Sequence, residues 1–429
     1  MANARRRVVI TGIGITSPYG VGTAPLIQGL SEGACALQAL DGRLAMVPPG
    51  IGARLDLPRK EFKQWFDTRV LRLSTMTRQT QLGCIAAGDL LKSMDLVPDG
   101  TQHPDKGAFL GSFIIPPDFR KQIRTARILN HRPEGEATGF VQDDARLDKA
   151  MKLASAFDFL RALPNMPSSH LSIQTGFQGP ACTYLGSDAS GLQAIGMAVQ
   201  MIRSGQASAM IAGGAFEPFQ EVHLAWQGQR GLWNTDDLDP QDRVRPYSVR
   251  TGNAPGEAGA VFYLEERDAA LARGATILGE VTGYGQRVLT PGTGEDVAVR
   301  VDALKAACDG TPDWIAPTGL GHAELDRLEV AAYADAFGED LGGAAALVAT
   351  PWVGLSGPAT APLQLAAGLL AARGELTPKR GLDVEAAPGC EAMVDALGRT
   401  AATGAGSRLI ASCFSIDGVH AALGVTVEA

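Results

Sequence analysis

Short apolar runs rich in β-branched residues alternate with amphipathic helical stretches along the whole chain of 429 residues. The run "RRVVITGIGITSPYG" (6–20) predicts a buried strand that ends in glycine turns, whereas "TRQTQLGCIAAGDLLKSMDL" (77–96) predicts a helix with one apolar face. Such alternation is typical of an α/β protein with largely buried sheets. The strand series starts again near residue 260, which predicts two similar halves. We expect residues 116–149 to form a polar, irregular excursion on the surface.

One segment, "GPACTYLGSDASGLQAIG" (179–196), predicts a strand that enters a helix through a tight turn of small residues. A turn of this kind usually directs one reactive side chain toward a substrate, and its tip here is Asp188. Aspartate is a poor covalent nucleophile but a preferred helix N-cap. We therefore interpret Asp188 as a cap. The alternative role, a catalytic base, is disfavoured because a helix N-terminus lowers the pKa of a nearby carboxyl.

Composition and charge exclude several functional classes. The chain has 38 basic and 46 acidic side chains, and the resulting net charge of −8 argues against a general nucleic-acid binder. No run approaches the ~18 apolar residues of a membrane helix. Six scattered cysteines without a CxxC pair and six histidines without metal-ligand spacing give no reason to expect zinc or another cofactor. Without a secretory signal, we expect a cytoplasmic protein with reduced thiols.

Five segments, in their order and spacing, resemble the β-ketoacyl synthases of fatty-acid and polyketide assembly, which belong to the thiolase-like superfamily. They are residues 6–20, 163–180, 194–214, 245–266 and 270–285, and the resemblance extends from about Arg6 to Val427. It implies a five-layered α/β/α/β/α fold of two related halves, usually dimeric. The halves are expected at residues 1–258, with a degenerate nucleophile turn at 186–190, and at residues 259–429.

The chemistry of this family requires a cysteine at the turn, two histidines that support decarboxylation and stabilise oxyanions, and a supporting lysine. The resemblance puts Asp188 in the place of the cysteine. The stretch 315–338 puts Thr318 in the place of the first histidine. The stretch 353–368 puts Pro358 in the place of the second histidine and Val353 in that of the lysine. The sequence therefore predicts that the scaffold remains while the catalytic set is lost.

Within the family this pattern resembles the chain-length factors (KSβ) of type II polyketide and polyene systems. The resemblance implies a heterodimer with a catalytic ketosynthase (KSα), an acyl carrier protein that binds through that partner, and an acyl tunnel closed by this chain. It implies tunnel or interface roles for seven residues: Phe113, Ile114, Ile115, Phe157, Phe159, Phe414 and Ile416. Ile416 replaces the gating phenylalanine of a loop that here reads "FSIDG" (414–418). One departure is the aspartate at the turn, where chain-length factors commonly have glutamine.

Two other functions remain open at this stage. The chain could be an active acyltransferase or condensing enzyme with a re-sited nucleophile, for which Cys182 is the first candidate, or a homodimeric, non-enzymatic acyl-chain binder. Ser187, His322 and His420 are further candidates for a rescued site. We interpret the cysteine as core filler in its strand and the other three as structural polar residues.

Overall fold

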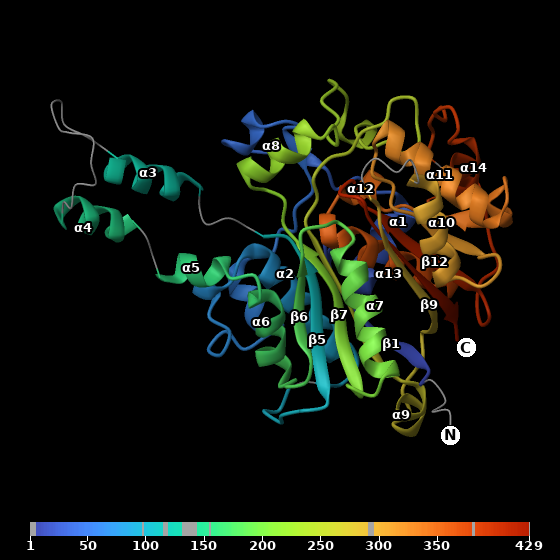
Figure 1. Ribbon diagram of the computed structural model, residues 1–429, viewed down its shortest axis with the longest axis horizontal. Helices are drawn as coiled ribbons and strands as arrows, with labels where there is room; N and C mark the ends of the chain where they lie inside the picture. The colour runs from blue at the N-terminus through green and yellow to red at the C-terminus, as the bar shows by residue number, and fades with distance from the viewer. Residues whose placement is uncertain are drawn as a thin grey trace.

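A computed structural model describes residues 6–96, 98–114, 119–130, 144–153, 156–290, 296–379 and 382–428. One mixed sheet of 11 strands runs through the molecule (Figure 1). Its strands are β1 (Val8–Ser17), β2 (Gly20–Val21), β5 (Lys106–Ser112), β6 (Ala181–Leu185), β7 (Ala209–Phe216), β8 (Ala258–Glu266), β9 (Gly279–Val288), β10 (Trp314–Ala316), β11 (Ala345–Ala346), β12 (Arg408–Phe414) and β13 (Val419–Val427). Two short strands, β3 (Gln38–Ala39) and β4 (Ile51–Gly52), form a separate pair.

Ten of these strands form two sets with the same order and directions. The first set runs β6-β5-β7-β8-β1 and the second β11-β10-β12-β13-β9. In each set the first three strands are parallel, and each of the last two is antiparallel to its neighbour. β8 begins at Ala258, where we expect the first half to end, and it pairs with β7 and β1 of the first set.

The helices make three layers around the two sets of strands. Between the sets lie α7 (Ser190–Arg203) and α13 (Thr360–Ala372), which contact strands of both. Every residue of α13 is buried, as its apolar sequence requires. The outer layers are α2 (Arg78–Ser93) and α6 (Met166–Thr175) on the first set, and α10 (Asp296–Ala307), α11 (Ala323–Phe337) and α14 (Glu391–Gly398) on the second.

Four further helices belong to the body: α1 (Thr23–Glu32), α8 (Glu221–Gln229), α9 (Arg267–Ala272) and α12 (Thr350–Val353). Throughout the described residues, no helix combines the length and the apolar character needed to cross a membrane.

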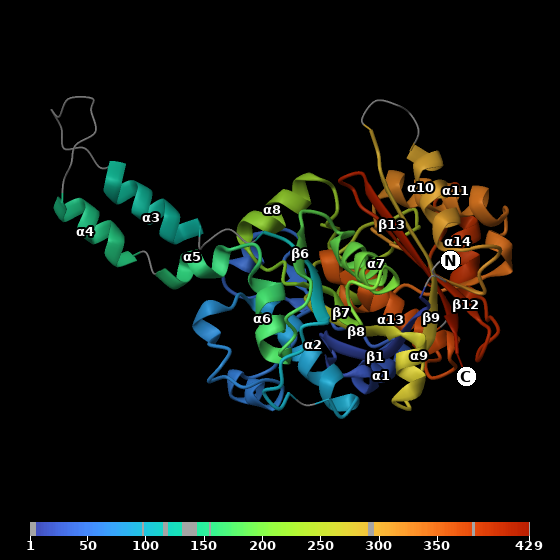
Figure 2. The ribbon, with the colours of Figure 1, turned by 60° about the horizontal axis from the view of Figure 1, so that its bottom comes forward.

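The expected irregular excursion contains regular structure. Two helices, α3 (Phe119–Asn130) and α4 (Asp144–Leu153), extend away from the body, followed by α5 (Ala156–Ala162) (Figures 1 and 2). The sequence prediction was wrong about their conformation because it followed the polar composition and missed the helical spacing of Phe119, Ile123 and Ala126 in α3. Their frequent Arg, Lys, Ala and Leu residues also favour helix. Residues 116–118 and 131–143 of the expected excursion lie outside the described residues.

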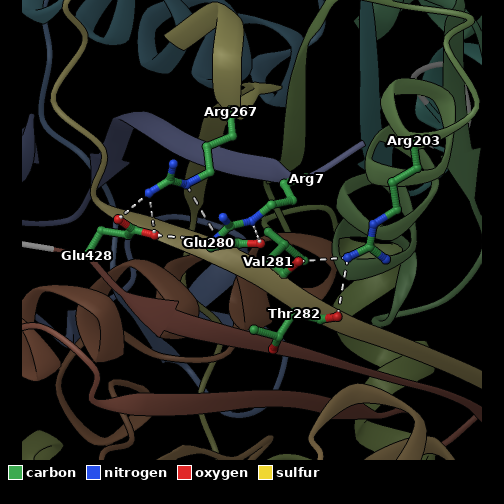
Figure 3. A network of polar contacts seen from close by, with 7 residues as sticks. All are labelled: Arg7, Arg203, Arg267, Glu280, Val281, Thr282 and Glu428. Atoms are coloured by element: carbon green, nitrogen blue, oxygen red, sulfur yellow. Dashed lines mark hydrogen bonds and ion pairs between the residues drawn. The ribbon is translucent and has the colours of Figure 1, made fainter. Parts of the chain in front are cut away.

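A network of arginines joins the two sets of strands at the lower edge of the sheet (Figure 3). Arg7 and Arg267 precede and follow strands of the first set, and they pair with Glu280 of β9 and with Glu428 after β13. Arg203 of α7 donates to the Val281 carbonyl at 2.7 Å. These contacts bind β9 and the end of the chain to the first half.

Close backbone packing between the halves makes one glycine sensitive to substitution. A Cβ at Gly191 in α7 would lie 2.0 Å from the Pro358 carbonyl oxygen, so we expect Gly191→Ala to lower the free energy of unfolding by ~1–3 kcal/mol. Chemical denaturation would measure the loss. Gly398→Ala is the matched control, because a Cβ added at Gly398 would meet nothing within 4 Å. Equal stability of the two variants would contradict this packing.

Candidate functional site

The turn at 186–190 lies between β6 and α7, as the sequence predicts, but Asp188 does not cap the helix. The N-cap residue of α7 is Ala189, which makes no side-chain capping bond. Serines satisfy the turn instead: the Ala189 N–H donates to Ser187 Oγ at 3.1 Å, and the Ser187 N–H donates to Ser190 Oγ at 3.2 Å. Ser187 therefore has a structural role in this turn.

The carboxyl group of Asp188 is enclosed in the protein. The residue is 1 % exposed, and neither carboxyl oxygen has a hydrogen-bond partner among the described residues. Desolvation raises its pKa to about 7, the negative charge of Asp417 adds to the rise, and Arg230 opposes it. The expected lowering of the pKa was wrong because burial without capping bonds outweighs the field of the helix N-terminus.

Thr318, which the sequence register assigns to the place of the first histidine, is buried and forms hydrogen bonds with α11 and β12. Its N–H donates to Glu329 Oε1 at 2.8 Å, and its Oγ1 accepts the Phe414 N–H at 2.8 Å. Glu329 also accepts from the Tyr247 hydroxyl at 2.7 Å and from Ser412 Oγ at 3.1 Å. The threonine side chain thus holds the last residue of β12 and has no acid–base group to offer a substrate.

Pro358, in the place of the second histidine, is buried in the turn 357–359. Its carbonyl lies against α7 and β7: a Cβ at Gly191 or Gly214 would lie 2.0 or 2.1 Å from its oxygen. A Cβ on the preceding Gly357 would lie 3.4 Å from Asp188 Oδ1. The structure therefore brings the Asp188 turn and the Pro358 turn together. Val353, the last residue of α12, is buried in the main hydrophobic core.

Four rings form an aromatic cluster beside Asp188, which sequence analysis did not single out as a whole. They are Phe113, Phe216, His223 and Trp226, with ring centroids 4.8 to 6.2 Å apart. A Cβ at Gly357 would lie 3.0 Å from Phe216 and 3.2 Å from Phe113, so these rings pack against the Asp188 pocket. The apolar sequence around Phe216 gave no signal that His223 would join them.

Charges at the edge of the aromatic cluster affect its histidine. The Arg230 guanidinium lies 4.4 Å from the Trp226 ring centroid and donates to Asp417 Oδ1 at 2.5 Å. Burial, assisted by Arg230, lowers the pKa of His223 to about 4. The imidazole is consequently neutral near pH 7, and its low pKa makes it a weak general base there.

The other proposed rescue residues have distinct environments. Cys182 lies exposed on the edge strand β6, so the expectation of core filler was wrong; partial desolvation nonetheless raises the pKa of its thiol, which disfavours the thiolate. His322 is the N-cap of α11 and accepts the Leu325 N–H at 3.4 Å. His420 is buried edge-on to Phe414, and its pKa falls to about 3 through burial and the charge of Arg300.

The tunnel and interface candidates separate into buried and exposed groups. Phe113 belongs to the aromatic cluster, and Phe414 lies in the core of the second half. Ile416 is partly buried against an apolar cluster that includes Leu224 and Leu355. The exposed group is Ile114, Phe157 and Phe159, at 64 %, 42 % and 67 % exposure. Ile115 lies outside the described residues.

No group of three or more His, Cys, Asp or Glu residues within the described ranges is placed to hold a metal ion. The site consists of the buried carboxyl group of Asp188 and the aromatic cluster beside it. This arrangement can limit the space available to an apolar chain.

The raised pKa of Asp188 makes folding stability depend on pH. The folded protein binds the Asp188 proton more tightly than the unfolded chain, in which the pKa of this group is near 3.8. The stabilisation that the bound proton contributes is therefore complete below about pH 4 and is lost as the pH rises through about 7. Asp188→Asn has no proton to lose at this position. Relative to the wild type, its free energy of unfolding should therefore be higher at pH 7.5 than at pH 4.5, by roughly a few kcal/mol. Denaturation at both pH values would measure it, with exposed Asp335→Asn as control. Identical pH dependence in wild type and Asp188→Asn would contradict this environment.

Known proteins resemble this chain in sequence and in fold. The family model for the β-ketoacyl synthase N-terminal domain matches residues 5–270. The actinorhodin polyketide β-ketoacyl synthase 1 of Streptomyces coelicolor is 29% identical over 86% of this chain and 77% of its own length. The ketoacyl synthase alpha subunit of the tetracenomycin polyketide synthase from Streptomyces glaucescens is 27% identical over 91% of this chain and 90% of its own.

Solved structures show the same fold. The ishigamide ketosynthase/chain length factor superposes with a TM-score of 0.79 at 21% identity, covering 99% of this chain and 100% of that one. A β-ketoacyl synthase from Burkholderia phymatum gives 0.78 at 22% identity, with the same coverage. The predicted thiolase-like α/β fold is confirmed, and the chain belongs to the β-ketoacyl synthase family.

Proposed function

We propose that this chain is a non-catalytic subunit of the chain-length-factor type, which pairs with an active ketosynthase and bounds its acyl tunnel. The observation that carries the proposal is the nucleophile turn. It holds Asp188, enclosed and with a raised pKa, where the family's chemistry needs a thiolate. The positions of the two histidines hold Thr318 and Pro358, whose contacts are structural.

The edge of the sheet supports pairing with a second subunit. β6 is the last strand of its set, and its first two residues are exposed, whereas β1, β7 and most of β8 are buried throughout. An exposed edge strand offers unpaired backbone groups to another chain. Among similar structures are a ketosynthase/chain length factor and a type II polyketide ketosynthase in complex with its acyl carrier protein. We propose that acyl carrier protein reaches the complex through the partner ketosynthase.

In this proposal the aromatic cluster and the exposed phenylalanines have different tasks. The aromatic cluster fills the space beside Asp188, so an acyl chain has no place at the degenerate turn of this subunit. The helix α5, which contains Phe157 and Phe159, lies on the same side of the molecule as β6 (Figures 1 and 2). There they can reach the partner and form part of the wall that ends its tunnel.

The two alternative functions make other demands on the same residues. A re-sited nucleophile at Cys182 would need a base, and desolvation raises the pKa of that thiol. A homodimeric acyl-chain binder would pair through the same β6 edge but would not bind a ketosynthase.

Co-expression with a ketosynthase encoded beside this chain tests the proposal directly. We expect a stable 1:1 complex in which the ketosynthase cysteine carries the acyl group, because this chain contributes an interface but no nucleophile. Light scattering after size-exclusion chromatography would measure the stoichiometry. A stable homodimer of this chain that binds no ketosynthase would contradict the proposal.

Substitutions of Phe159 test the proposed tunnel wall. Phe159→Ala should shift the products of the complex toward longer chains because it removes a bulky ring, and Phe159→Trp should shift them toward shorter ones. Mass spectrometry of the released products would show the shift. Leu271→Ala, at an exposed apolar residue of α9, is the control. An unchanged product profile for both Phe159 variants would remove this residue from the wall.

A further inference from the structure

A cavity in the outer layer of the first half is separate from the Asp188 site. It is bounded by residues 63–71, by one face of α2 and by the end of α6, and it is called here the outer cavity. Its volume of about 860 Å³ is within the range of ~300–1,000 Å³ that is typical of small-molecule sites. None of the residues that line it belongs to the Asp188 turn, the turn 357–359 or the aromatic cluster. The outer cavity therefore has no part in the function proposed above.

Trp65 forms one wall of the outer cavity, and its position is fixed by three contacts. Its carbonyl oxygen accepts from Gln174 Nε2 at 3.3 Å. A Cβ added at Gly88 would lie 2.1 Å from the same oxygen, so the glycine lets residue 65 pack directly on α2. Lys92 Nζ lies 4.4 Å from the centroid of the indole ring, at the distance of a cation–π contact.

Two polar atoms of this wall have no hydrogen-bond partner within the described ranges. They are Trp65 Nε1, a donor, and Gln174 Oε1, an acceptor. Gln174 is 9 % exposed, and its Nε2 donates to the carbonyl oxygens of Trp65 and Cys84. These two bonds fix the orientation of the amide, so Oε1 remains the free acceptor. A buried polar atom without a partner costs free energy, which a bound ligand recovers by supplying the missing bond.

The charge of the outer cavity favours an anion. Its lining contains three basic side chains, Lys63, Arg69 and Lys92, and one acidic side chain, Asp67. Asp67 pairs with Arg69 at 2.8 Å, whereas neither lysine forms an ion pair in the part of the chain that the structure describes. Two ammonium groups thus remain for a ligand, in a chain whose net charge is −8.

Apolar side chains from three segments also line the outer cavity. Phe66, Leu71 and Leu91 are buried, whereas Val70 and Ile173 are 59 % and 56 % exposed. Exposed apolar groups beside unpaired charges favour a ligand that has both an apolar body and a charge. An inorganic anion has no apolar part to cover these groups.

We propose that the outer cavity binds a small organic acid that has an apolar ring or chain and one O–H or N–H donor. The carboxylate pairs with Lys92 and accepts from Trp65 Nε1, and the donor bonds to Gln174 Oε1. Both of these polar atoms are shielded from solvent in this structure, so the ligand displaces the flexible Lys92 chain that lies over the indole ring. This inference does not depend on the proposed function, since the chain binds the acid without a partner subunit.

The test titrates two probes of this class, 4-hydroxyphenylacetate and indole-3-acetate, into the purified full-length chain, followed by saturation-transfer NMR. We expect saturable binding of both. Trp65→Phe keeps an aromatic ring and removes the N–H, and Lys92→Met removes the charge, so each should raise Kd at least about fivefold. Lys305→Met, at an exposed residue of α10, is the matched control and should leave Kd unchanged.

Matched probes test the polar contacts without any substitution. Phenylacetate lacks the hydroxyl group of 4-hydroxyphenylacetate, and p-cresol lacks its carboxylate. Each should bind the wild-type chain at least about fivefold more weakly than 4-hydroxyphenylacetate. Because Lys92 is exposed, Lys92→Met and these probes remain decisive if Trp65→Phe lowers stability.

The outcomes decide the proposal. Saturable binding that weakens in both variants, with unchanged circular dichroism, would support the site. No saturable binding of either acid to the wild-type chain would overturn it, as would equal affinity in the wild type and both variants, which would place the acid elsewhere. Equal affinity for p-cresol and 4-hydroxyphenylacetate would leave an apolar cavity without the proposed anion contact and would also contradict the proposal.

Discussion

The contact on which the site depends is the packing of one carbonyl group against two glycines. The Pro358 carbonyl, from the second half, occupies the space that Cβ atoms of residues 191 and 214 would need. Gly191 lies in the first turn of α7 and Gly214 lies on β7, so this contact fixes the central helix, a central strand and the turn 357–359 relative to one another. Asp188 is enclosed because these three elements meet beside it. A single methyl group added at either glycine would disturb this close packing.

Under the proposed function, the same packing accounts for a turn that persists without a nucleophile. In a working ketosynthase the turn and the two histidine positions must converge on one acyl group. Here the Asp188 turn and the Pro358 turn meet, Thr318 holds the Phe414 backbone, and aromatic rings pack around Gly357. Each degenerate position has a structural contact. The fold is thus stabilised at the place where the family's enzymes retain functional groups.

Much of the fold follows from the sequence, because several strands of the core are long apolar runs, the central helix α7 has one apolar face and the central helix α13 is buried on every side. β1 and α13 are clear examples. The order of strands and the family emerge from segment resemblance. The helices α3 and α4 were not predicted, since the sequence interpretation followed their polar composition and missed the helical spacing of Phe119, Ile123 and Ala126. The environment of Asp188 was also mispredicted: sequence indicates a helix start, but not that Ser187 and Ser190 satisfy the turn and leave the carboxyl group buried. His223 joins the site only through tertiary packing across β7 and α8.

The central claim is that this chain provides structure and no nucleophile. Intact-protein mass spectrometry tests it most directly, after the purified chain, alone and with its ketosynthase, is incubated with acyl- and malonyl-loaded acyl carrier protein. The account predicts an acyl adduct on the ketosynthase cysteine and none on this chain in either sample. A stoichiometric adduct on this chain alone, whether at Cys182 or elsewhere, would contradict it.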